Sequence, residues 1–169
     1  MPKTQKGFSL IELLIVVAII LIIAAIAIPN LLRAKMAANE ASAVGSVRTI
    51  NTGAVTFSST YGAGYPPALS NEGGAVGATV SCAGAQLIDA SLSSAVSATT
   101  AKSGYYFTYL AGGTAVTVGT CTGHPSYTLV ATPSVPGQTG QRLFFSDQSG
   151  VIRFTSDGST PTVSSPALQ

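Results

Sequence analysis

The chain has 169 residues, of which 46% are hydrophobic and only 8% are charged, with eight Lys and Arg against six Asp and Glu. This length fits one domain with an added segment, and the 18 Gly indicate a loop-rich domain with a modest core. Beyond Arg48 the only basic side chains are Lys102, Arg142 and Arg153, which are scattered along the chain. The composition therefore argues against a nucleic-acid-binding protein, which would present a basic stripe or patch.

The N-terminal segment carries the strongest signal. Leu13 to Ile28 is an unbroken run of sixteen apolar residues closed by Pro29, and one carboxylate, Glu12, stands at its start. Insertion into a membrane gains about 0.3 to 0.6 kcal/mol for each large aliphatic residue, which outweighs the cost of about 3 kcal/mol for a single carboxylate. We therefore expect residues 8–29 to span a membrane. An ionisable group there is a candidate functional residue, the alternative being a carboxylate that only reaches the membrane interface.

These residues resemble the N-terminus of type IV prepilins. A short basic leader ends at Gly7 and Phe8, Glu12 follows four residues after Phe8, and Pro29 follows twenty-one residues after it. The resemblance implies that a prepilin peptidase removes residues 1–7 and methylates the new amino terminus at Phe8. It further implies a precursor in the inner membrane that polymerises, through pilus or secretion assembly machinery, into an extracellular homo-oligomeric helical filament.

Phe8 and Glu12 are the predicted assembly residues. The free amine of a processed Phe8 and the carboxylate of Glu12 lie one helical turn apart, and neither charge is stable alone in hydrocarbon. If subunits stack with an axial offset, the Glu12 carboxylate of one subunit neutralises the Phe8 amine of the next. This pairing would set the register of the filament.

Two other functions stay open. Ala25-Ile26-Ala27 fits the cleavage site of an ordinary secretory signal, which would give a monomeric secreted binding protein. The carboxylate inside the apolar run, the length of that run and the helical pattern beyond Pro29 argue against this interpretation. Within the family, the alternative is the major pseudopilin of a type II secretion system, located in a periplasmic pseudopilus. A surface pilus is slightly favoured, and its role in motility, adhesion, DNA uptake or secretion is not predicted.

The predicted fold class is α+β and pilin-like, with a long N-terminal α-helix packed on a small antiparallel β-sheet. Pro29 predicts a kink, and residues 30–61 follow the pattern of an amphipathic helix. The apolar stripe that should carry the head domain recurs at steps of three or four residues: Val44, Val47, Ile50, Ala54, Phe57 and Tyr61. Gly45 and Gly53 weaken this helix, so they indicate close packing or flexibility.

Residues 62–157 are expected to form the globular head. A short helix is predicted within 83–96, and strands are predicted over 105–110, 114–118, 126–132, 142–146 and 151–155. Asp147 to Gly150 is the expected turn of the last hairpin. Residues 158–169, rich in Ser, Thr and Pro, have little to bury and are expected to form a flexible tail.

Cys82 and Cys121 are the only cysteines, and in an exported head they predict a disulfide bond. Cys121 and His124 have a C-x-x-H spacing, but zinc needs four ligands and no second pair follows. No metal or cofactor is predicted. The sole histidine, the lack of a nucleophile elbow and the sparse carboxylates also argue against an enzyme. The aromatic residues of 105–109 predict either an adhesive surface or ordinary strand packing, with packing favoured.

Overall fold

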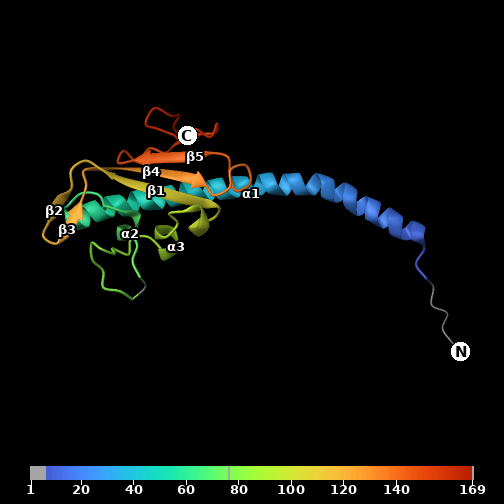
Figure 1. The fold of residues 1–169 in the computed structure, drawn as a ribbon, viewed down its shortest axis with the longest axis horizontal. Coiled ribbons are helices and arrows are strands. Elements are labelled where there is room, and N and C mark those ends of the chain that lie inside the picture. The colour runs from blue at the N-terminus through green and yellow to red at the C-terminus, as the bar shows by residue number, and fades with distance from the viewer. Residues whose placement is uncertain (1–6, 76, 169) are drawn as a thin grey trace. The chain divides into compact units, whose positions relative to one another are not determined.

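The computed structural model describes residues 7–75 and 77–168, so the predicted leader lies outside it except for Gly7. The chain divides into two compact units, Met1–Lys35 and Met36–Gln169. Helices and strands follow in this order: α1 (Leu10–Tyr61), α2 (Leu69–Glu72), α3 (Ala90–Ser93), the 3-10 helix η1 (Ala98–Thr100), β1 (Tyr105–Gly112), β2 (Val116–Val118), β3 (Cys121–Gly123), β4 (Ser126–Pro133), β5 (Leu143–Asp147) and β6 (Arg153–Thr155) (Figure 1). This confirms the α+β class and the long first helix.

The head is built on a four-stranded antiparallel sheet with strand order β1-β4-β5-β6, while β2 and β3 form a separate hairpin. The long β1 and β4 strands pair over their whole length, from Tyr105 opposite Pro133 to Gly112 opposite Ser126. Every second residue of β4 is buried, starting at Tyr127. This alternation presents one apolar face of the sheet to α1 and the other elements that cover it.

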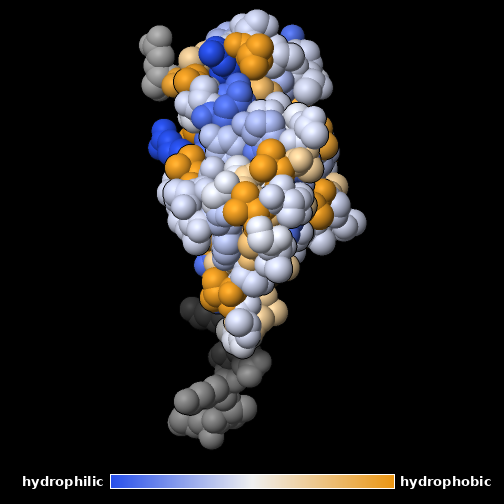
Figure 2. All heavy atoms as spheres, turned by 90° about the vertical axis from the view of Figure 1, so that its left-hand side faces the viewer, coloured by the Kyte–Doolittle hydropathy of each residue, from blue (hydrophilic) through white to orange (hydrophobic). Residues whose placement is uncertain are grey.

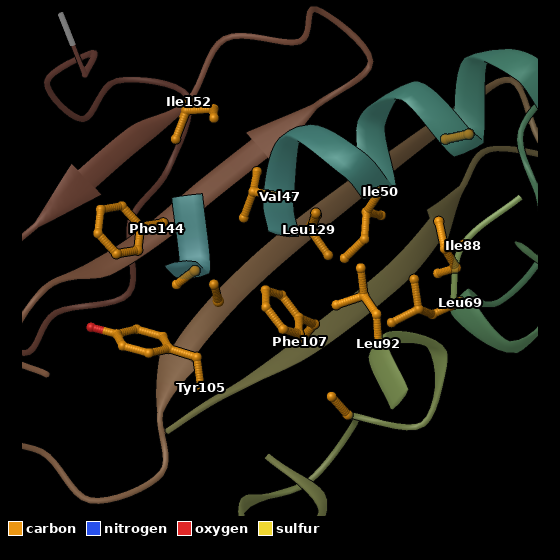
Figure 3. Packing of buried hydrophobic residues seen from close by; sticks show 14 of the residues in the cluster. Val47, Ile50, Leu69, Ile88, Leu92, Tyr105, Phe107, Leu129, Phe144 and Ile152 are labelled. Carbon is orange, nitrogen blue, oxygen red and sulfur yellow. The ribbon is translucent and has the colours of Figure 1, made fainter. Parts of the chain in front are cut away.

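The second half of α1 supplies the opposite side of the core. Val47, Ile50, Ala54 and Phe57 are completely buried, which confirms these four residues of the predicted stripe, whereas Val44 and Tyr61 are partly buried. In Figure 3, Val47 and Ile50 of α1 lie over Leu129 of β4, and the cluster continues towards the residues that precede β1. Those residues, which we call the connector (residues 62–104), contribute Leu69, Ile88 and Leu92 to the same core.

Two polar contacts fix the helix against the sheet. The Asn51 side chain donates to Ser146 Oγ at 2.8 Å and accepts from the Tyr127 hydroxyl at 2.9 Å. Glu40 accepts from the backbone N–H groups of Gln141 at 2.9 Å and Arg142 at 3.2 Å, and from Arg142 Nε at 2.7 Å. Because buried polar groups are costly when unpaired, these bonds select one position of the β4–β5 loop along α1.

The pKa of Glu40 reflects this arrangement. Burial on its own raises the pKa of the Glu40 carboxyl, but the hydrogen bonds from Gln141 and Arg142 and the charge of Arg142 together outweigh it. The pKa therefore lies below its ordinary value of 4.5, and the carboxylate is ionised at neutral pH.

Several predicted elements differ from the structure. The helix expected within 83–96 is reduced to the four residues of α3, whereas α2 and β3 were not predicted. Such short elements lack enough residues to show a period. Gly150 N donates to Asp147 O at 2.9 Å, which confirms the predicted turn of the last hairpin.

The C-terminal segment makes contacts that its composition did not predict. The backbone of Leu168 donates to Ile152 O at 2.7 Å, and Phe154 N donates to Pro166 O at 3.0 Å. The Leu168 side chain packs against the core, and Pro161 is buried. The expectation that residues 158–169 have little to bury is therefore wrong at Pro161 and Leu168, while the flexibility of the tail stays a prediction.

Candidate processing and assembly site

The predicted cleavage junction lies immediately before α1. Gly7 and Phe8 are both exposed, with 80% of the Phe8 surface accessible, and the helix begins two residues later at Leu10. A Cβ added at Gly7 would meet nothing within 4 Å. The described part of the fold therefore does not require a glycine at this position, and any requirement for glycine would come from another molecule.

Glu12 makes a local contact that the sequence analysis missed. The backbone N–H of Ser9 donates to Glu12 Oε2 at 2.9 Å, and Leu13 N donates to Ser9 O at 3.2 Å. This is one half of a capping box, in which a glutamate three residues after the N-cap satisfies the N-cap amide. The signal was available as the pattern Ser9-x-x-Glu12. Glu12 thus stabilises the start of its own helix, in addition to any role between subunits.

The first half of α1 exposes an apolar surface on all its sides. Among the described residues, α1 is the one helix that is long and apolar enough to cross a membrane, and its most apolar window has no buried residue. The exposed large side chains run from Leu10 to Leu32. Such a surface requires lipid or another protein around it, because a soluble monomer rarely leaves an apolar patch of this extent in water.

Pro29 lies inside α1, which continues through it. Proline has no N–H to donate to the carbonyl four residues earlier, which is that of Ala25. Next to this position, Asn30 Nδ2 donates to Ile26 O at 3.0 Å. The predicted kink at Pro29 stays a prediction.

The predicted disulfide is confirmed. Cys82 in the connector is bonded to Cys121 in β3, across a sequence separation of 39 residues. The bond ties the connector to the β2–β3 hairpin. It also excludes the zinc alternative at Cys121 and His124, since the Cys121 sulfur is already used. In the described part of the chain, no group of three or more His, Cys, Asp or Glu could hold a metal ion.

The aromatic residues of β1 pack into the head, as favoured from the sequence. Tyr105 and Phe107 are buried, and the Tyr109 ring stacks on Tyr127 with centroids 5.1 Å apart. On the face of the head shown in Figure 2, apolar residues form small separated groups. That face therefore shows no continuous hydrophobic patch.

The comparisons with known proteins agree with this geometry. A family model described as "Prokaryotic N-terminal methylation motif" matches residues 2–28. The chain is also 63% identical over 38 residues to the type IV wide pilus major component PilA4 of Thermus thermophilus, a match that covers 22% of this chain and 29% of that protein. No solved structure matches the chain.

The methylation motif and the match to a pilus component support a pilin-type subunit. The exposed apolar half of α1 and the α+β head agree with this class. This N-terminal similarity is to type IV pilins, and neither match extends over the whole chain. The likeness to the Thermus protein is confined to a short segment, less than a third of that protein's length.

Proposed function

We propose that this chain is the structural subunit of a type IV pilus-like surface filament, made as an inner-membrane precursor and polymerised through the first half of α1. The observation that carries the proposal is the exposed apolar surface from Leu10 to Leu32 directly after a prepilin-type junction. Membrane lipid would cover this surface before assembly, and copies of the same helix would cover it afterwards. The relative's role as a major pilus component favours a pilus over a secretion pseudopilus.

The proposal requires cleavage after Gly7 by a prepilin peptidase, which leaves Phe8 as the first residue. Filaments sheared from cells that express the chain should yield, by mass spectrometry, a subunit beginning with N-methylated Phe8. A Gly7→Leu variant should accumulate as an uncleaved membrane precursor. A mature subunit beginning at Ile28 would instead show ordinary secretion, and filaments confined to the periplasm would show the pseudopilin alternative.

We further propose that Glu12 pairs with the Phe8 amine of a neighbouring subunit during assembly. The capping contact with Ser9 offers a competing explanation for Glu12, and substitutions separate the two. Glu12→Gln keeps a side-chain oxygen that accepts the Ser9 N–H but cannot neutralise an amine. Glu12→Ala removes both interactions, and loss of a cap costs about 0.5 to 2 kcal/mol.

If charge pairing drives assembly, both variants should insert and be cleaved normally but yield few filaments, with Glu12→Gln almost as defective as Glu12→Ala. The readout is the ratio of sheared filament to membrane-bound mature subunit. If capping is the main role, Glu12→Gln should assemble normally and only Glu12→Ala should fail. Full assembly of both variants would show that neither role matters.

A further inference from the structure

Glu72, the last residue of α2, is the most anomalous side chain of the head. It is fully buried, and both of its carboxylate oxygens lack a hydrogen-bond partner in the described chain. The only other buried side-chain oxygen without a partner in the same residues is the Tyr109 hydroxyl. An ionised carboxylate in such a position would be very unstable, so a specific arrangement must keep it neutral or open a path to water.

The groups around Glu72 offer no compensating charge. On the α1 side lies Gly53, where a Cβ would stand 2.5 Å from Glu72 Oε2 and 3.1 Å from Ile88 Cγ2. On the sheet side, β1 and β4 contribute Tyr109 and Tyr127, whose pKa values are raised mainly by burial and further by a charge on Glu72. No basic side chain of the described residues acts on Glu72, and burial raises the pKa of its carboxyl from 4.5 to about 9. Glu72 is therefore a neutral acid at pH 7.

The same residue organises the connector through its backbone. The carbonyl oxygen of Glu72 accepts from Leu87 N at 2.7 Å and from Ile88 N at 3.2 Å, and Ala85 N donates to Asn71 O at 2.9 Å. Leu69 and Ile88, which flank these bonds, belong to the core. If the Glu72 side chain left its position, this short pairing of residues 71–73 with 85–88 would open with it, while the disulfide at Cys82 would still hold the segment between them.

We propose that Glu72 is a proton-controlled latch on the connector. The neutral side chain holds residues 69–73 and 85–88 against α1 and the sheet, and ionisation releases them while the disulfide keeps Cys82 attached to the β2–β3 hairpin. The latch needs no ligand. Its parts are the space left by Gly53, the unpartnered carboxyl and the pairing across Glu72 O.

The direction of the pH dependence follows from the proton balance. The closed state holds a proton on Glu72 up to about pH 9, whereas the open state loses it above about 4.5. Between these values the closed state binds one more proton, so closure is favoured fully below about pH 4.5 and weakens as pH rises. The opening equilibrium constant should rise about tenfold per pH unit in this window and become constant above about pH 9.

Residue-resolved amide hydrogen exchange on the full-length chain in detergent micelles tests the latch. Amides of Ala85, Leu87 and Ile88 report connector opening, and amides of Leu129 and Ala131 in β4 are the internal reference. The ratio of connector to reference exchange removes the common base catalysis of exchange itself. We expect this ratio to rise about 100-fold between pH 6 and pH 8 in the natural chain.

Glu72→Gln is the matched control, because it keeps the shape of the side chain but cannot ionise. Its ratio should stay constant over the same pH range. A constant ratio in the natural chain, or an equal rise in Glu72→Gln, would overturn the latch. If Glu72→Gln does not fold, the ratio in the natural chain decides alone, since an opening that followed global unfolding would move both sets of amides together.

Discussion

Two glycines in the same helix should respond in opposite ways to the same substitution. Gly53 is buried against Glu72 Oε2 and Ile88 Cγ2, whereas Gly45 is exposed and a Cβ there would meet nothing within 4 Å. Alanine is favoured over glycine in a helix by about 1 kcal/mol. Gly45→Ala should therefore stabilise the head by about 0.5 to 1 kcal/mol.

At Gly53 the cost of overpacking exceeds the gain in helix propensity. The Glu72 side chain is fully buried, so its oxygen, 2.5 Å from the new Cβ, has no free space into which to move. Overpacking of this kind costs about 1 to 3 kcal/mol. After subtraction of the helix gain, Gly53→Ala should destabilise the head by up to about 2 kcal/mol.

The assay is urea unfolding of the full-length chain in detergent, followed by near-ultraviolet circular dichroism of the buried tyrosines. The helix gain is common to both variants, so they should differ by the overpacking cost of about 1 to 3 kcal/mol, or about 2 to 12 °C in Tm for a chain of this size. In a Glu72→Ala background the shortest contact is removed and only the 3.1 Å contact with Ile88 Cγ2 remains, so Gly53→Ala should destabilise the head less than in the natural chain. Equal effects of Gly53→Ala in the two backgrounds would refute the role assigned to Glu72.

Three further outcomes are expected from the same unfolding measurement. Glu40→Gln should destabilise the head by about 1 to 2 kcal/mol, because the Arg142 ion pair is lost while an oxygen still accepts from the backbone; an effect below about 0.5 kcal/mol would contradict this. The Glu40 pKa is lowered, so its contribution is present above pH 4.5 and is lost as pH falls below it, a dependence that Glu40→Gln should lack. Replacing Cys82 and Cys121 together by serine should cost about 4 kcal/mol for a loop closed over 39 residues, and reduction of the natural chain should have the same effect.

The sequence predicts those parts of the fold in which one local pattern repeats over many residues. Leu10 to Tyr61 is a single helix because aliphatic residues first fill all its sides and then follow a helical stripe that includes Val47 and Ile50. The long strands β1 and β4 were predicted over 105–110 and 126–132 because these residues favour strands, and the structure extends them to eight residues each. The connector was poorly predicted, since its helices have only three or four residues each and take their shape from contacts with the core.

Contacts between residues far apart in the sequence could not be predicted from the sequence alone. Glu40 and Arg142 are 102 residues apart, and nothing in either neighbourhood points to the other. Glu72 stands in the polar run Ser70-Asn71-Glu72-Gly73, which is typical of an exposed turn, yet it is fully buried. The contact between Ser9 and Glu12 is different, because its capping pattern lies within four consecutive residues and can be recognised in the sequence.

Both halves of α1 carry apolar side chains that need to be buried, but the two halves are buried by different partners. From Ala43 onward, one face of the helix is buried by the sheet and the connector of its own chain, and Asn51 is paired there with Tyr127 and Ser146. From Leu10 to Leu32, the large side chains are exposed in the single chain, and each would gain about 1.5 to 3 kcal/mol on full burial. The head can therefore fold around its half of the helix within one subunit, whereas the other half reaches a stable environment only in lipid or among other helices. Under the proposed function this exposed half is the assembly surface, and it is complete before assembly begins. The carboxylate of Glu12 is the one charge that it carries between Leu10 and Leu32.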